Sequence, residues 1–272
     1  MTDADLYIQK LEESNPWQEP ILREAIRALD LPRGSRGLDV GCGIGLPTLL
    51  LAEALGPEGG VTGLDVSAQR LHYAEQLVMK SALAKQISFR EGDMYRLPYE
   101  DDCFDWLWSI DCAGYPVGEL LPLLREFSRV VKPGGCVAIL SWSSQQLLPG
   151  YPLLEARLNA TCSSYIPYVR DAKPEANFLR ALGWFRQVEL EDVIAQTFLG
   201  EVQAPLGEGI RIALVSLFEM LWDARQPETS EQDWCDFQRL CRPDSPDFIL
   251  NLPDYYAFFS YTMFRGKVPG RG

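Results

Sequence analysis

The chain contains 272 residues, of which 47% are hydrophobic and 23% are charged, and this balance excludes extensive disorder. Its 38 acidic residues outnumber the 25 basic ones, which gives a formal net charge of -13. This charge would repel a phosphate backbone or an anionic membrane surface. The basic residues are scattered singly and form no local basic strip, so we expect no nucleic-acid partner.

The first predicted elements form one β-α-β unit. An amphipathic helix is expected at residues 18–29, after which LPRGSRG breaks the helix and a buried strand runs into the glycine loop LDVGCGIG. Residues 46–55 predict a helix, and VTGLDVS at residues 61–67 is a second apolar run that ends in an acid. The first residues show no basic region followed by an apolar one, so secretion is not expected. No 18 residues run without polar interruption, so a membrane span is not expected either.

Three further strands continue this pattern. Ser67 is expected to cap a helix over residues 67–84, and QISFREGD predicts a third strand with a polar exit. Residues 104–111 and 134–142 predict two more buried strands, separated by a helix near residues 118–131. Because each strand is apolar throughout and alternates with a helix, we expect an α/β fold in which helices cover both faces of a parallel sheet.

The second half of the chain is less regular. Its expected elements are an aromatic, proline-punctuated segment (149–175), a helix and a strand (near 176–198), a long helical stretch (about 206–241) and a strand (255–264). We interpret residues 1–272 as a single domain whose core is formed by residues 18–142. Two insertions, residues 143–180 and 203–250, are expected to form a helical and aromatic cap.

Polar residues collect at the carboxyl ends of the predicted strands, which is where parallel sheets bind ligands. We call the residues that follow each carboxyl end a strand exit. At the first strand exit, a G-x-G-x-G loop follows Asp39, and the backbone of this loop suits an anionic group. Asp65 ends the next strand and can bind both hydroxyls of a ribose, although an acid also suits a helix N-cap. Residues 91–94 offer Asp93 for an exocyclic amine and Met94 for an adenine face, although a plain turn would also explain them.

Four stretches in this order resemble the class I S-adenosylmethionine-dependent methyltransferases, especially the group that includes the ubiquinone and menaquinone biosynthesis methyltransferases. They are LDVGCGIG, LDVSAQRL, FREGDMYRLPYEDDCFDWLWS and LREFSRVVKPGGCVAIL. The likeness is strong over residues 18–142, and the segment PYEDDCFD departs from the family pattern by Tyr99 in place of phenylalanine. It implies a Rossmann-like, mostly parallel seven-stranded sheet, with S-adenosyl-L-methionine bound by residues 18–142.

The resemblance also implies roles for individual residues. The glycine loop is expected to line the methionine portion, Asp65 to bind the ribose, Arg70 to lie near the adenosine, and Asp111 to face the methionine end. Asp93 with Met94 is expected to hold the adenine. The full cofactor-binding set is Asp39, Gly41, Cys42, Gly43, Gly45, Asp65, Val66, Arg70, Gly92, Asp93, Met94 and Asp111.

Methyl transfer starts from an activated donor, so orientation and desolvation can supply most of the rate. Asp111 and Tyr115 follow the fourth strand and are the candidate catalytic residues, able to orient or deprotonate an acceptor. The only histidine, His72, is interpreted as a surface or packing residue, and a metal site would lack ligands. The seven cysteines form no C-x-x-C pair, so we expect reduced thiols and a cytoplasmic location.

The acceptor is expected to be a small aromatic, isoprenoid or polyketide-like molecule, with an amine as the closest competitor, and the oligomeric state stays open. Two other functional classes are possible. An NAD-dependent oxidoreductase would share the glycine loop and the ribose acid, but it would use G-x-G-x-x-G and a Tyr/Lys or His machinery. A non-catalytic scaffold or partner subunit would bind the same cofactor with a closed acceptor pocket.

Overall fold

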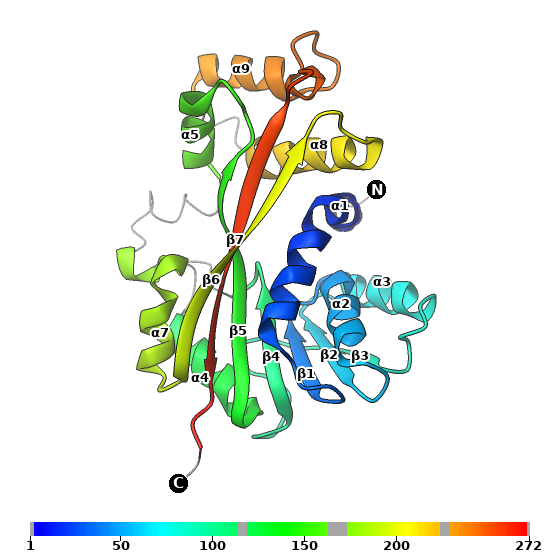
Figure 1. Cartoon of the computed structure of the whole chain (residues 1–272), viewed down its shortest axis with the longest axis vertical. Helices are drawn as coiled ribbons and strands as arrows, with labels where there is room; N and C mark the ends of the chain where they lie inside the picture. Colours follow the sequence, from blue (N-terminus) through cyan, green and yellow to red (C-terminus); the bar gives the residue numbers. More distant parts are fainter. Residues whose placement is uncertain (1–2, 114–118, 163–172, 224–228, 271–272) are drawn as a thin grey trace. The chain divides into compact units, whose positions relative to one another are not determined.

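The chain folds into two compact units. The computed structural model describes residues 3–113, 119–162, 173–223 and 229–270 (Figure 1). The core unit comprises Leu22–Trp142, Pro174–Phe198 and Tyr261–Gly272, and the second unit comprises Met1–Ile21, Ser143–Lys173 and Leu199–Ser260. The predicted insertions fall largely in the second unit, while their role as a cap and the single-domain interpretation stay predictions.

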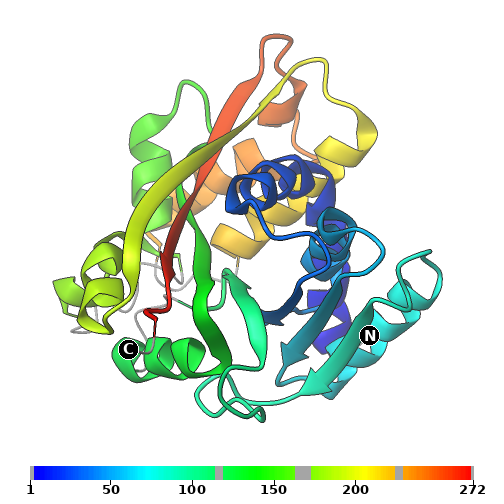
Figure 2. The same ribbon diagram turned by 60° about the horizontal axis from the view of Figure 1, so that its bottom comes forward.

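Seven strands form one sheet within the described residues. They are β1 (Arg36–Val40), β2 (Gly60–Asp65), β3 (Ile87–Glu91), β4 (Phe104–Ile110), β5 (Val131–Gln146), β6 (Glu191–Gln203) and β7 (Tyr256–Lys267). Their spatial order is β3-β2-β1-β4-β5-β7-β6, and every pairing from β3 to β5 is parallel (Figures 1 and 2). The winding reverses between β1 and β4, which creates the switch point where such sheets bind ligands.

Strand β7 is antiparallel to its neighbour β5. Val268, just after β7, exchanges two backbone hydrogen bonds with Gly134 and Gly135 near the start of β5, at 2.8 and 2.9 Å. At the other ends of the two strands, the Ser260 and Ser143 hydroxyl oxygens lie 3.0 Å apart. The opposed arrows in Figure 1 agree with this pairing. The predicted fold class, a mostly parallel seven-stranded sheet, is therefore confirmed.

Helices cover both faces of the sheet in the core unit. They are α2 (Leu46–Leu55), α3 (Ala68–Met79), α4 (Leu120–Val130), α7 (Ala181–Gln187) and the end of α1 (Asp3–Leu29), with 3-10 turns η1 (Pro174–Ala176) and η2 (Phe178–Arg180). Leu38 of β1 belongs to one buried cluster with Phe127 of α4 and Trp184 of α7. Its neighbour Asp39 points to the opposite face, because side chains alternate along a strand, and binds Thr48 of α2.

The second unit contains the start of α1 and three further helices. These are α5 (Pro152–Ala160), α8 (Glu208–Trp222) and α9 (Glu231–Cys241), followed by the 3-10 turn η4 (Ile249–Asn251). The carboxylate of Glu155 is buried and accepts the backbone N–H groups of Leu147 and Leu148 at 2.8 and 2.9 Å. An ion pair of 2.7 Å between Arg157 and Asp233 joins α5 to α9.

Several predicted boundaries are wrong. Strand β5 runs over Val131–Gln146 and not only over residues 134–142. Helix α1 begins at Asp3 instead of near residue 18, even though it contains two prolines. Helix α3 ends at Met79 and not at residue 84, because the N–H of Lys80 turns back onto the last turn of the helix. The expected helical stretch 206–241 is divided into α8 and α9. In the part of the chain that the structure describes, no helix combines the length and the apolar character needed to cross a bilayer.

Candidate functional site

The glycine loop between β1 and α2 has a backbone that glycine alone adopts readily. Gly41, Gly43 and Gly45 have φ angles of 75°, 55° and 81°. The Gly41 N–H donates to the carbonyl of Leu64 at 2.7 Å, which fixes the loop to the end of β2. A Cβ atom at Gly41 would lie 2.5 Å from the Cys112 sulfur, so the chain after β4 closely approaches the loop.

Asp39 lies beneath this loop and is fully buried. Its Oδ2 accepts a hydrogen bond of 2.6 Å from the Thr48 hydroxyl, whereas Oδ1 has no hydrogen-bond partner within the described residues. Burial raises the pKa of Asp39 to about 7; the Thr48 hydrogen bond opposes this rise and the negative charge of Asp65 adds to it. Asp39, which was predicted to bind the cofactor, is therefore a buried acid that lies below the loop and binds Thr48.

Asp65 connects the first two strand exits. Its Oδ2 accepts the N–H of Gly43 at 3.0 Å, so the carboxylate reaches from the end of β2 into the glycine loop. Its Oδ1 accepts three donors: the Ser67 N–H at 2.9 Å, and Nε and Nη2 of Arg70 at 3.1 and 2.6 Å. The side chain is 5% exposed, so the Arg70 ion pair is a partly buried contact.

The third exit joins the same group of residues. Gly92 N–H donates to the carbonyl of Asp65 at 3.1 Å, and Asp93 accepts the N–H of Tyr95 at 2.9 Å. The Met94 sulfur lies 3.7 Å from the thiol sulfur of Cys112. Beside Asp65, the side chain of Val66 is 61% exposed, which leaves an apolar surface next to a carboxylate.

The fourth exit presents Asp111 at the end of β4. Its Oδ1 accepts the N–H of Trp142 at 2.9 Å, and its Oδ2 accepts the hydroxyl of Tyr261 at 3.0 Å. Asp111 is exposed to solvent by its accessible surface, although many protein atoms surround its carboxyl group. This desolvation raises the pKa of Asp111 to about 6, while the two hydrogen bonds lower it. The other candidate catalytic residue, Tyr115, lies outside the described residues.

Among the residues that the structure describes, those predicted at the four strand exits lie together, and three further residues that the sequence analysis did not name join them. The added residues are Thr48, Trp142 and Tyr261, which bind the carboxylates of Asp39 and Asp111. His72 is exposed and bonded to Gln76 at 2.9 Å, in line with its interpretation as a surface residue.

Burial also raises the pKa of the Cys112 thiol to about 11, and the charges of Asp65 and Asp39 add to the rise. Cys112 is therefore a protonated residue packed against the loop rather than a nucleophile. The described residues contain no group of three or more His, Cys, Asp or Glu side chains arranged to hold a metal ion. This site thus consists of glycine backbone, carboxylates, one arginine and soft sulfur atoms.

Comparison with known proteins identifies the family. A family model described as a methyltransferase domain matches residues 31–190, which include all four strand exits. The chain belongs to this methyltransferase family. The matched region begins before the glycine loop and contains every candidate cofactor residue.

Two curated relatives and one solved structure illustrate the similarity. A demethylmenaquinone methyltransferase of Bacillus cereus is 39% identical over 126 residues, covering 46% of this chain and 52% of the relative. One of Staphylococcus aureus is 34% identical over 149 residues, covering 55% and 58%. The chain therefore spans little more than half the length of these relatives. A SAM-dependent methyltransferase of Aquifex aeolicus shares the fold, with a TM-score of 0.53, 22% identity and coverage of 70% and 90%.

Proposed function

We propose that this methyltransferase-family protein binds S-adenosyl-L-methionine at the carboxyl ends of β1, β2, β3 and β4 and transfers its methyl group to a small molecule. The family assignment and the demethylmenaquinone methyltransferase relatives support this proposal. So does the convergence of glycine backbone, acids and apolar side chains at the switch point, because this cofactor carries a carboxylate, an ammonium, a ribose diol and an adenine.

The hydrogen bond from Gly43 N–H to Asp65 Oδ2 is the observation that carries the proposal. It joins the loop assigned to the methionine portion with the acid assigned to the ribose, so one ligand can span both. Oδ1 of Asp65 already accepts three donors, but Oδ2 accepts one within the described residues. Because a carboxylate oxygen has two lone pairs, Oδ2 is the atom that we assign to a ribose hydroxyl.

The remaining candidate residues surround this central contact. We assign the backbone of Gly41, Cys42, Gly43 and Gly45, supported by Asp39 below, to the methionine portion. We assign Val66, Gly92, Asp93 and Met94 to the adenine, and Arg70 to the orientation of Asp65. The exposed Val66 and the polarizable Met94 suit the faces of an aromatic base, and the Asp93 carboxylate suits its exocyclic amine.

Methyl transfer is an in-line displacement in which the acceptor forms a bond to the methyl carbon while the sulfur–carbon bond breaks. The acceptor proton, if it has one to lose, must go to a base. Asp111 is the group that we assign to this step, because its pKa of about 6 lets it accept a proton near neutral pH. Its competing role is to bind the cofactor ammonium, and Tyr115 stays a second catalytic candidate.

We infer that the acceptor is a small aromatic molecule of the kind named in the relatives, demethylmenaquinone, and that an amine is the principal competitor. A nucleic-acid acceptor is disfavoured by the net charge of -13. The seven cysteines are thiols rather than disulfides in the structure, and we infer from this a reducing compartment such as the cytoplasm.

Calorimetric titration of the purified protein tests the cofactor assignment. We expect S-adenosyl-L-methionine and S-adenosylhomocysteine to bind at one site, and NAD not to bind. Asp65→Asn should weaken both by at least about tenfold, because a charge-assisted hydrogen bond is lost. Asp192→Asn is the matched control, since Asp192 is an exposed acid paired with Lys267. Binding of NAD in place of the two adenosyl ligands would overturn the proposal.

The activity assay uses S-adenosyl-L-methionine labelled in its methyl group. The label should move to reduced demethylmenaquinone, with the product identified by mass spectrometry, and a panel of small aromatic amines serves as the competing acceptor class. Tight cofactor binding without transfer to either class would favour the scaffold function over the enzyme.

A further inference from the structure

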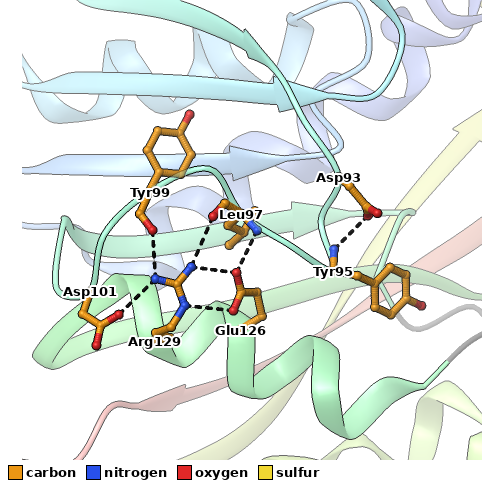
Figure 3. Close-up of polar contacts among 7 residues, drawn as sticks. All are labelled: Asp93, Tyr95, Leu97, Tyr99, Asp101, Glu126 and Arg129. Atoms are coloured by element: carbon orange, nitrogen blue, oxygen red, sulfur yellow. Dashed lines mark hydrogen bonds and ion pairs between the residues drawn. The ribbon is translucent and has the colours of Figure 1, made fainter.

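Arg129, near the end of α4, uses its whole guanidinium group to hold the segment that follows the third strand exit. Figure 3 shows the side chain pointing at this segment. Nη1 donates to the Tyr99 carbonyl at 2.8 Å and to Asp101 at 3.0 Å, and Nη2 donates to the Leu97 carbonyl at 3.2 Å. Nε and Nη2 also bind the two carboxylate oxygens of Glu126 at 2.9 and 2.7 Å. These contacts use all five N–H donors of an arginine.

Two backbone contacts complete the attachment. Glu126 Oε1 accepts the N–H of Leu97 at 2.7 Å, so both polar backbone groups of Leu97 are bound by this pair of side chains. The carbonyl of Arg129 accepts the N–H of Asp102 at 3.1 Å. Residues 97–102 are thus fixed to the last turns of α4 through charge-assisted hydrogen bonds, which are the stronger class.

A single tight turn connects this attachment to the candidate adenine residues. The N–H of Arg96 donates to the carbonyl of Asp93 at 3.1 Å, so Asp93 and Leu97 stand on the two sides of one turn. At its other end, the segment is bound to the strand that carries the ribose acid, through the Gly92 N–H and the Asp65 carbonyl at 3.1 Å. A movement of the backbone at Leu97 therefore moves Asp93 and Met94.

We propose that Arg129 and Glu126 are positioning residues that fix the adenine side of the cofactor site, an inference that rests on the proposed binding of S-adenosyl-L-methionine. Neither side chain needs to touch the ligand. Together they orient the backbone at Leu97, and the 93–96 turn transmits that orientation to Asp93 and Met94. The pair thereby determines cofactor affinity from the far side of the segment.

A positioning role differs from a purely structural one because the segment has an independent apolar anchor. The Leu97 side chain is 3% exposed and belongs to the buried cluster that includes Phe127 of α4. The Tyr99 ring packs edge-on against Phe104 at 4.9 Å. These contacts should keep the segment folded when Arg129 is replaced. What is lost is the direction of the backbone, because a lysine ammonium is a point charge that cannot span two carbonyls and a carboxylate.

Four variants and two probes test the inference by calorimetry. Arg129→Lys and Glu126→Ala should weaken binding of S-adenosylhomocysteine by about tenfold. Glu126→Gln should recover part of that loss, since its amide oxygen can still accept the Leu97 N–H. Arg125→Lys, an exposed arginine on the same helix, should leave the affinity unchanged. The second probe, 5′-methylthioadenosine, lacks the amino-acid portion and should lose affinity by the same factor.

The outcomes separate this inference from the proposed function. If the wild-type protein binds neither probe, the proposed function fails. If the wild type binds both and Arg129→Lys binds equally tightly, the positioning role is wrong. A lower binding stoichiometry at unchanged affinity would mean that the variant only unfolds, which also overturns the inference. If the variants lost affinity for S-adenosylhomocysteine but not for 5′-methylthioadenosine, the effect would lie on the methionine side of the site, and the inference would be wrong.

Discussion

The hydroxyl of Tyr261 on β7 donates a hydrogen bond of 3.0 Å to Asp111 at the end of β4, although 150 positions separate the two residues in the chain. Tyr261 is 1% exposed, and its ring packs edge-on against Trp142 at 5.5 Å. Trp142 in turn donates its backbone N–H to the other carboxylate oxygen. Residues of two strands, β5 and β7, thus fix the orientation of the candidate base.

Replacing Tyr261 with phenylalanine should raise the pKa of Asp111 above its present value of about 6. The hydroxyl stabilises the ionised carboxylate, so its removal favours the protonated form. At a given pH near neutrality, fewer molecules would then carry an ionised base, and the acid limb of the pH–rate profile should move to higher pH. Carbon-13 NMR titration of labelled aspartate, with the Asp111 signal assigned by its loss in Asp111→Asn, measures the pKa directly.

Tyr256→Phe is the control, because Tyr256 lies on the same strand and its hydroxyl binds the exposed Glu201 at 2.8 Å. This variant should change neither the pKa of Asp111 measured by NMR nor the pH–rate profile. If Tyr261→Phe moved the NMR pKa but not the acid limb, Asp111 would be a cofactor ligand and not the base.

Gly41→Ala should abolish cofactor binding and lower stability more than the same change at Gly134. Both glycines have a left-handed backbone, with φ of 75° and 79°, so each alanine introduces similar strain of about 1–2 kcal/mol. At Gly41 the new Cβ would also lie 2.5 Å from the Cys112 sulfur, whereas at Gly134 it meets nothing within 4 Å. Urea unfolding of both variants measures the difference. Equal losses of stability in the two variants would show that the loop can move away from Cys112.

The sequence predicts the sheet, the four strand exits and the glycine loop because these features depend on local patterns. Helix α2 follows the predicted residues 46–55 without error, and Ser67 caps α3 by accepting the N–H of Arg70. Local periodicity determines such elements, so they can be predicted from neighbouring residues alone. The end of α3 is not predicted because no glycine or proline directly follows its last residue, and propensity alone does not set a boundary. The division between α8 and α9 does have local signals, Pro227 in the sequence and Ser230 as the N-cap of α9, which the expectation of one long helical stretch did not use.

Long-range partners could not be predicted for a different reason. Nothing near Tyr261 in the sequence indicates that it binds Asp111, since that contact depends on β7 entering the sheet between β5 and β6. The attachment of residues 97–102 by Arg129 likewise joins two segments about 30 residues apart. The family motif contains Arg129 and Glu126, but a motif does not say which backbone groups a side chain will bind.

Thiol labelling should divide the cysteines by environment. Burial raises the pKa of Cys112 and of Cys136 to about 11, so both should react slowly with iodoacetamide at pH 8. Cys103 and Cys235 are exposed and should be labelled first. Peptide mass spectrometry over a time course gives the order. Early labelling of Cys112 that S-adenosylhomocysteine suppressed would mean that the loop opens in the absence of ligand.

Asp39 should make the protein less stable as the pH rises from about 4 to about 7. Burial raises the pKa of this carboxyl in the folded state from 3.8 to about 7, so below about pH 4 both states hold the proton. Between these values the unfolded state releases the proton and the folded state keeps it, which lowers the free energy of unfolding by about 1.4 kcal/mol per pH unit. The total loss in the free energy of unfolding is up to about 4 kcal/mol, and no further loss occurs above about pH 7.

Asp39→Asn removes this titrating carboxyl group. As the pH rises from about 4 to about 7, the wild type should therefore lose stability relative to the variant. Asp105→Asn serves as a control of opposite sign. Burial of Asp105 is outweighed by hydrogen bonds from Lys132 and the Arg36 N–H, which lower its pKa, so its stabilisation exists at neutral pH and is lost on acidification. Urea unfolding at a series of pH values compares the three proteins. A pH-independent difference for Asp39→Asn would mean that the pKa of Asp39 is the same in the folded and unfolded states, and the predicted rise would be wrong.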